Sequence, residues 1–252
     1  MTPSQVVEHV KQKDWNIAEQ PGNVGADAGP ALLPLLDERD PQVRQLAVTC
    51  LNTAGGPSAK QGLLRALRDR TDTVRAAAAR FLQGHFTKAD VSILQRELSV
   101  STDEYVREQI ALLLGILGGD VSFLQARFIT EKDEHARHAM SLALARLGET
   151  VHRQELIGRL QHDAPAGRVS ALRDLPYVGD RGLLVHVLPL LDDTRPGMNV
   201  GPSHGRFMIR ICDMAVNAAN ELLGGPFSWV QRVKRYSPQE LEQAKMALSG
   251  IR

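Results

Sequence analysis

Two sets of side chains in this sequence of 252 residues have the types and spacing to do chemistry. His135 and His138 lie three residues apart on a candidate helix, a spacing that could present two ligands to a metal ion. A column of arginines recurs every 30 to 32 residues, a pattern that could bind a series of phosphate groups. The arginines are Arg44, Arg75, Arg107, Arg137 and Arg168.

The neighbours of the arginines favour a structural role over anion binding. Each arginine has an aspartate three to five residues before it, whereas phosphate binding needs positive charge that no carboxylate neutralises. None of the eight histidines is followed by a glutamate, so the sequence holds no His-Glu dipeptide. We therefore expect no catalytic residue, no metal and no cofactor.

The arginines belong to a repeat that begins with Asp40–Gly55, DPQVRQLAVTCLNTAG, and returns four more times. Each copy has a small or apolar residue three positions after its arginine and a leucine seven positions after it, which lie on one face of a helix. A second apolar column precedes each copy at a fixed interval of 31 residues: Leu36, Leu67, Leu98, Ile129, Leu160 and Leu191. A fixed period of this length is typical of a stacked helical array.

The repeat predicts an all-α fold, a right-handed α-solenoid of about six helical pairs. We expect a single domain over residues 1–252, with repeats at 29–224 between an N-terminal cap at 1–28 and a C-terminal cap at 225–252. Both caps are degenerate, because the ends of an array must cover its last apolar faces. No stretch alternates long enough to suggest strands.

The repeat resembles HEAT repeats, in the short bacterial type also found in phycobilin lyase subunits. The residues that carry the resemblance are the turn Asp, the Val-Arg early in the second helix and the closing Leu-Gly. The resemblance implies that the turn aspartates and helix arginines form a structural ladder between neighbouring repeats. Its members here would be Asp40 and Arg44, Asp72 and Arg75, Asp103 and Arg107, Asp133 and Arg137, and Asp163 and Arg168.

Enzymes with HEAT-like folds remain the alternative. A base-excision enzyme would need a basic groove, but 30 Lys and Arg against 29 Asp and Glu leave no basic excess, and both tryptophans, Trp15 and Trp229, lie in the caps. A bilin-lyase-like chaperone would need a partner subunit and a pigment pocket, and no residue argues for either.

An insertion at Asp192–Phe207, rich in Gly and Pro, breaks the last repeat. Two interpretations stay open: a tolerated surface loop, since long insertions cost little, or a loop that contacts a partner. If the loop contacts a partner, the side chains that we expect to make the contact are Arg195, Met198, Asn199, His204 and Arg206.

These features favour a non-catalytic scaffold or adaptor that binds another protein on the concave face of its second helices, with sequestration of that protein as one outcome. We expect a cytoplasmic monomer without nucleic-acid partners. We also expect no membrane partner, because no segment reaches the roughly 18 apolar residues of a membrane span. Cys50 and Cys212 lie in apolar helical patterns and are expected to be reduced core residues.

Overall fold

The computed structural model describes residues 1–252 except 21, 163, 201–206, 232–233 and 251–252. Its contacts divide the chain into two compact units, Met1–Met140 and Ser141–Arg252. Helix α10, Glu134–Arg146, crosses the boundary between them. The single domain expected from the repeat stays a prediction.

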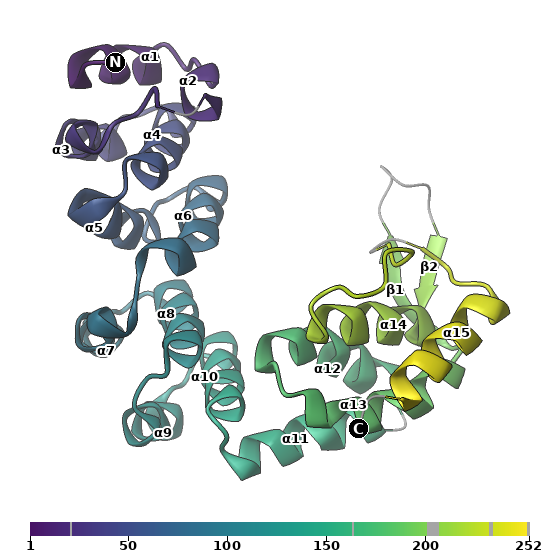
Figure 1. Cartoon of the computed structure of the whole chain (residues 1–252). Coiled ribbons are helices and arrows are strands. Elements are labelled where there is room, and N and C mark those ends of the chain that lie inside the picture. Colours follow the sequence, from purple (N-terminus) through teal and green to yellow (C-terminus); the bar gives the residue numbers. More distant parts are fainter. Residues whose placement is uncertain (21, 163, 201–206, 232–233, 251–252) are drawn as a thin grey trace. The chain divides into compact units, whose positions relative to one another are not determined.

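The first unit is built of helical pairs. In Figure 1, α3, α5, α7 and α9 form one layer, and α4, α6 and α8 form the other. The helices are α1 (Pro3–Lys11), α2 (Asn16–Glu19), α3 (Gly29–Leu32), α4 (Pro41–Ala54), α5 (Gly56–Ala66), α6 (Asp72–His85), α7 (Val91–Val100), α8 (Glu104–Leu117) and α9 (Val121–Thr130). The 3-10 turns are η1 (Ala26–Ala28), η2 (Leu33–Asp37) and η3 (Lys88–Asp90).

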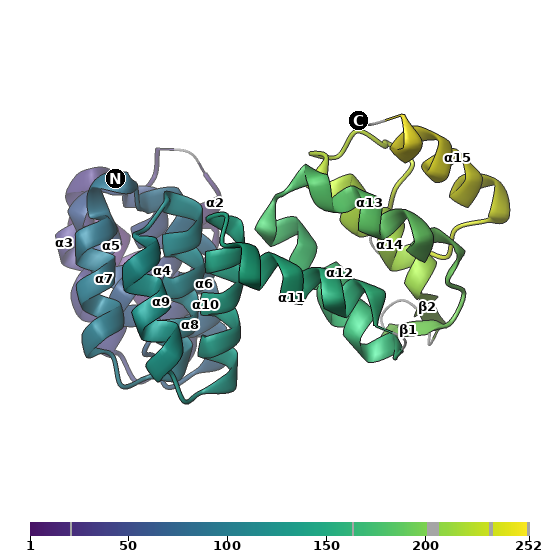
Figure 2. The ribbon, with the colours of Figure 1, turned by 90° about the horizontal axis from the view of Figure 1, so that it is seen from below.

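The second unit continues the pairs and adds a β-hairpin. Helices α12 and α14 pack against each other, and strand β1 contacts both (Figures 1 and 2). The helices are α11 (Thr150–Gln161), α12 (Pro165–Val178), α13 (Leu184–Val187), α14 (Ile211–Leu222) and α15 (Pro238–Ser249), with 3-10 turns η4 (Arg181–Leu183) and η5 (Leu188–Asp192). The strands are β1 (Pro196–Val200) and β2 (Phe207–Arg210). The α-solenoid fold is confirmed.

The hairpin was missed in the sequence, where Asp192–Phe207 is expected to be a loop. Strands β1 and β2 pair antiparallel, with Met198 opposite Ile209 and Asn199 opposite Met208. Only one strand lies wholly within the insertion, so period-2 alternation is too short there to predict a sheet. The hairpin is the only sheet within the described parts of the chain.

The apolar columns of the second helices are buried as the repeat predicts. Leu51, Leu114 and their equivalents are at most 3% exposed. The column of the first helices is wrong at one position, since Ile129 is 72% exposed. Ile129 lies eight residues before Arg137, the same spacing that Leu36, Leu67 and Leu160 have to their arginines, but α9 buries Leu124 instead.

Arg44 shows how the ladder is built. Its Nε and Nη2 donate to the two carboxylate oxygens of Asp69 at 2.7 and 2.8 Å. Nη1 donates to the carbonyls of Glu38 and Arg39, and Nη2 also donates to Thr71 Oγ1. All five N–H groups of this guanidinium are thus satisfied although the side chain is 2% exposed.

The ladder carboxylates differ from those expected. Arg44 does not pair with Asp40, because Asp40 caps α4 through the N–H of Gln42 and pairs with Lys13 at 2.6 Å. A carboxylate at the start of a helix is oriented toward that helix's own N–H groups. The arginine reaches forward instead, to the acidic residue of the next turn.

The same correction applies to two further pairs. Arg107 binds Glu131 at 2.7 Å while Asp103 caps α8, and Arg168 binds Asp193 at 2.6 Å. These partners lie 24 and 25 residues ahead. Asp163, the expected partner of Arg168, lies outside the described residues.

The two remaining arginines, Arg75 and Arg137, make contacts of other kinds. Arg75 does pair with Asp72, and it also donates to the carbonyl of Asp69. The guanidinium of Arg137 lies over the ring of Phe128, 5.2 Å from its centroid, while Asp133 accepts from a backbone N–H of α10. These arginine contacts join successive turns of the array.

Candidate functional site

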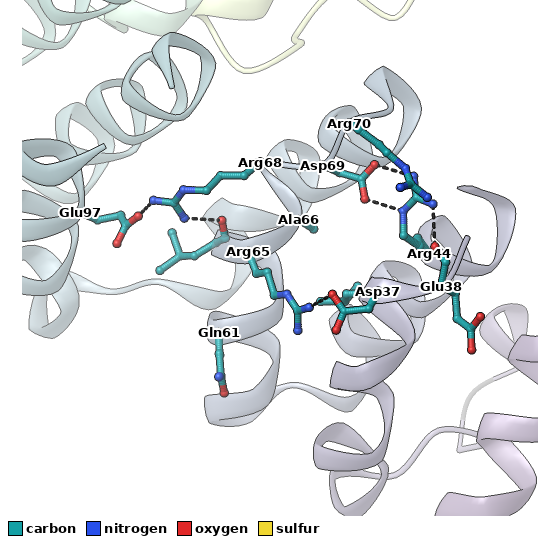
Figure 3. Close-up of a pocket in the computed structure, with 12 residues that line it drawn as sticks. Asp37, Glu38, Arg44, Gln61, Arg65, Ala66, Arg68, Asp69, Arg70 and Glu97 are labelled. Carbon is teal, nitrogen blue, oxygen red and sulfur yellow. Dashed lines mark hydrogen bonds and ion pairs between the residues drawn. The ribbon is translucent and has the colours of Figure 1, made fainter. Parts of the chain in front are cut away.

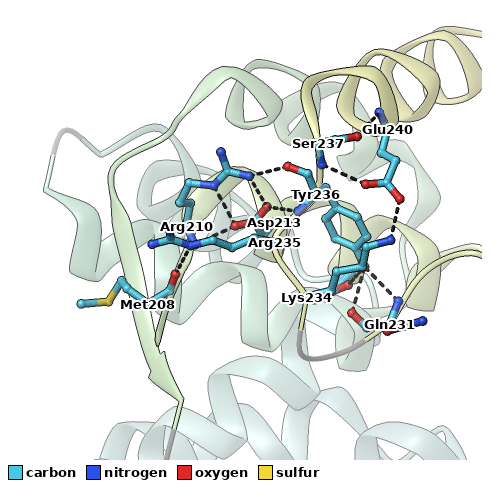
Figure 4. A network of polar contacts seen from close by, with 10 residues as sticks. Met208, Arg210, Asp213, Gln231, Lys234, Arg235, Tyr236, Ser237 and Glu240 are labelled. Carbon is cyan, nitrogen blue, oxygen red and sulfur yellow. Dashed lines mark hydrogen bonds and ion pairs between the residues drawn. The ribbon is translucent and has the colours of Figure 1, made fainter. Parts of the chain in front are cut away.

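Asp213 of α14 organises the end of the second unit (Figure 4). Either it or Cys212 stands where the repeat would place its arginine, depending on the register. The carboxylate is fully buried and accepts four N–H groups: the backbone, Nε and Nη2 of Arg210, and the backbone of Tyr236. Arg235 also donates to the carbonyl of Met208 at 2.6 Å. These bonds fix strand β2 to the segment that precedes α15.

Strand β1 closely approaches both β2 and α14 at Gly197. A Cβ at this position would lie 2.9 Å from the carbonyl oxygen of Ile209 and 3.0 Å from Sδ of Met214. The pairing is irregular between Pro196 and Met198, as at a β-bulge. Only glycine fits this approach, which brings the next residue, Met198, beside α12 and α14.

A cavity of about 410 Å³ lies among α12, the hairpin and α14. We call it the hairpin pocket. Its buried apolar lining comes from Leu172 of α12, Ile209 of β2, and Met214 and Ala218 of α14, which are at most 7% exposed. Met198 of β1 stands at the opening, 37% exposed.

The polar lining of the hairpin pocket comes from the two helices. Arg173 lies on α12, and Asn217 and Glu221 lie one turn apart on α14. The hydroxyl of Tyr236 donates to Oδ1 of Asn217 at 2.7 Å, which orients this amide. The cavity therefore combines apolar walls with a few placed polar groups, as small binding pockets do.

Three of the insertion residues singled out from the sequence, Arg195, Met198 and Asn199, are described, and of these only Met198 lines this pocket. Arg195 binds Asp193 through Nε and Nη2 at 2.9 and 2.8 Å, so its guanidinium is occupied within its own turn. Asn199 is exposed on β1, and His204 and Arg206 lie outside the described residues. The contact role of all five stays a prediction.

A second cavity, of about 570 Å³, lies in the first unit beside the turn that follows α5 (Figure 3). Four arginines line it, which would suggest an anion site. Three of them pair with carboxylates at its walls: Arg44 with Asp69, Arg65 with Asp37, and Arg68 with Glu97. These carboxylates neutralise most of the positive charge of the cavity. We therefore assign its residues to the ladder rather than to an anion site.

Ser141, His152 and Glu155 come together without forming an accessible nucleophile. Ser141 Oγ lies 3.0 Å from His152 Nδ1 and donates to Glu155 Oε2 at 3.1 Å. Ser141 is 7% and His152 5% exposed, and burial lowers the pKa of His152. The Ser141 hydroxyl donates to the Glu155 carboxylate, and this buried group links α10 to α11.

Both cysteines, Cys50 and Cys212, are buried and unbonded to each other, and burial raises the pKa of Cys50 to about 12. Within the described residues, no cluster of three or more His, Cys, Asp or Glu side chains has a geometry that could hold a metal. No helix in the described part of the chain has the length and apolarity to cross a membrane.

Comparison with known proteins supports the repeat assignment. A family model for HEAT repeats matches residues 15–83 and again 29–115. Residues 15–115 of this chain are HEAT repeats. Among solved structures it is similar to the complex of CpcE and CpcF of phycocyanin lyase from Nostoc sp. PCC7120, with 18% identity and a TM-score of 0.52. The match covers 98% of this chain and 95% of that chain, and at this identity it shows the fold alone. No curated protein matches the chain.

The last repeat holds pocket and network residues that the sequence did not reveal. Arg210 and Asp213 are three residues apart, a spacing that suits an ion pair at a helix start, and this signal was available. Arg173 and Pro176 do not stand out in the repeat pattern. They line the pocket only because the hairpin lies beside α12 in the folded chain. The insertion thus turns one repeat of the array into a pocket.

Proposed function

We propose that this HEAT-repeat protein is a non-catalytic adaptor that binds a protein partner at the hairpin pocket. The single observation that carries the proposal is the exposed Met198 at the opening of a cavity with a buried apolar lining. Partially exposed apolar side chains beside a concave pocket are typical of the contact sites that supply most binding energy.

The rigidity of the pocket supports this function. The hairpin is fixed on one side by Asp213 and Arg210, and Asn217 is held by Tyr236. A preformed pocket loses little conformational entropy on binding, so more of the contact energy appears as affinity. The solved relative with this fold is itself a complex of two proteins, CpcE and CpcF, which is compatible with a protein partner here.

The resemblance to HEAT-like enzymes gives two alternatives to this function, a bilin-lyase-like role and a base-excision role. The likeness to a phycocyanin lyase structure is compatible with the first, but at 18% identity it carries no residue of a lyase site to this chain. The near-equal counts of basic and acidic residues do not favour nucleic acid. Neither alternative has a specific observation behind it.

Site-specific photo-crosslinking tests the proposal. A photoreactive amino acid replaces Met198 in one variant and Met246 of α15 in a matched control, which is the more exposed methionine at 70%. In the source cell, the variant at Met198 is expected to give a defined protein adduct that the control does not. Equal adducts from both positions, or none from either, would contradict binding at this pocket.

A further inference from the structure

Among the described residues, the lining of the hairpin pocket holds two charged side chains, Arg173 and Glu221. Arg173 is exposed on α12 and has no ion pair within the described residues. Its neighbour Asp174 is occupied, since it accepts from Arg159 at 2.6 Å. Glu221, which also lines the pocket, has an interaction of its own. Arg173 is therefore the cation of the lining that no described carboxylate pairs with.

The acidic groups of the insertion do not neutralise that charge either. Asp193 accepts from both Arg168 and Arg195, and these hydrogen bonds hold its pKa far below the usual range against the opposing effect of burial. Its carboxylate is thus committed to the ladder. Arg173 remains the cation beside the apolar opening at Met198.

We propose that the hairpin pocket recognises a short acidic segment of the partner protein. A large apolar side chain of that segment enters between Met198 and Met214, and a neighbouring Asp or Glu carboxylate binds Arg173. This inference rests on the proposed function, and it adds the chemistry of the partner. A guanidinium gives a carboxylate two parallel donors, which provides direction as well as charge.

Selection from a random peptide library displayed on phage tests the inference with the full chain as bait. Peptides enriched on the wild type but not on Met198→Asp are expected to pair a large apolar residue with Asp or Glu. Replacing that acid by its amide in a synthetic peptide should weaken binding about tenfold, as a charge-assisted contact would. On Arg173→Glu, the selection should switch to peptides that carry Lys or Arg.

The outcomes separate the inference from the proposed function. Apolar peptides that depend on Met198 but show no acidic preference, or an acidic preference that Arg173→Glu leaves unchanged, would overturn the inference and leave the protein-binding site in place. Enrichment of basic segments on the wild type would overturn it too. No enrichment dependent on Met198 would overturn both. Circular dichroism of each variant confirms that the helical fold is retained.

Discussion

Arg44 and Asp69 form a bidentate ion pair between successive repeats, with Nε–Oδ2 and Nη2–Oδ1 distances of 2.7 and 2.8 Å. The two side chains are 2% and 8% exposed. Two charges buried to this extent are stable only because each satisfies the other's hydrogen bonds. Loss of either side chain would therefore leave a buried charge unpaired between the first repeats.

Removal of the Asp69 carboxylate should be costly. Asp69→Ala leaves the Arg44 guanidinium buried without its counter-charge, so we expect a loss of about 3 to 5 kcal/mol in the free energy of unfolding. Asp40→Ala is the matched control, because it removes a helix cap and an exposed ion pair and should cost only about 1 kcal/mol. Urea unfolding compares the two, and a larger loss at Asp40 would refute the ladder as described.

Stability should fall in acid. Burial raises the pKa of Asp69, but hydrogen bonds from Arg44 and the Thr71 N–H outweigh it, so the net pKa is lowered. A lowered carboxyl pKa contributes stability above its unfolded value of 3.8 that is lost as the pH falls through the folded pKa. The unfolding free energy should therefore decrease below about pH 4, and less so in Asp69→Asn. A stability that rises on acidification in this range would contradict the assignment.

The two apolar columns should respond differently to truncation. Leu114 is fully buried in α8, and Leu114→Ala should cost roughly 2 to 5 kcal/mol. Ile129 is 72% exposed, and Ile129→Ala should change stability by less than about 0.5 kcal/mol. Chemical denaturation measures both, and comparable losses would mean that the outer face of α9 is covered.

The contrast between Leu114 and Ile129 shows what sequence periodicity can predict. The helical columns follow from local spacing, so the pairs of helices, the buried leucines and the capping boxes at Thr2 and Ser237 could be predicted. A fixed interval does not show which face of a helix is covered, and α9 buries Leu124 rather than Ile129.

Ladder partners and the pocket depend on contacts between distant residues. The carboxylates that bind Arg44 and Arg107 lie 25 and 24 residues ahead, and an aspartate only four residues before each arginine is the nearer choice in the sequence. Met198 could be singled out from the insertion, but its neighbours in the pocket come from α12 and α14. No linear pattern connects Arg173 to Met198.

Removal of Pro176 should stabilise α12. Pro176→Ala restores an N–H to the interior of the helix and should raise the melting temperature, since proline inside a helix costs about 3 kcal/mol. Thermal unfolding followed by circular dichroism compares the variant with the wild type. An unchanged or lower melting temperature would contradict this expectation.

The affinity of the natural partner for two methionine variants tests the central claim most directly. Met198→Asp places a charge at the apolar opening of the hairpin pocket, whereas Met246→Asp places the same charge on α15, at a methionine outside the pocket lining that is 70% exposed. With the crosslinked partner purified, calorimetry should show that Met198→Asp weakens binding by at least about tenfold while Met246→Asp leaves it within about twofold. Equal affinity of both variants and the wild type would contradict binding at this pocket.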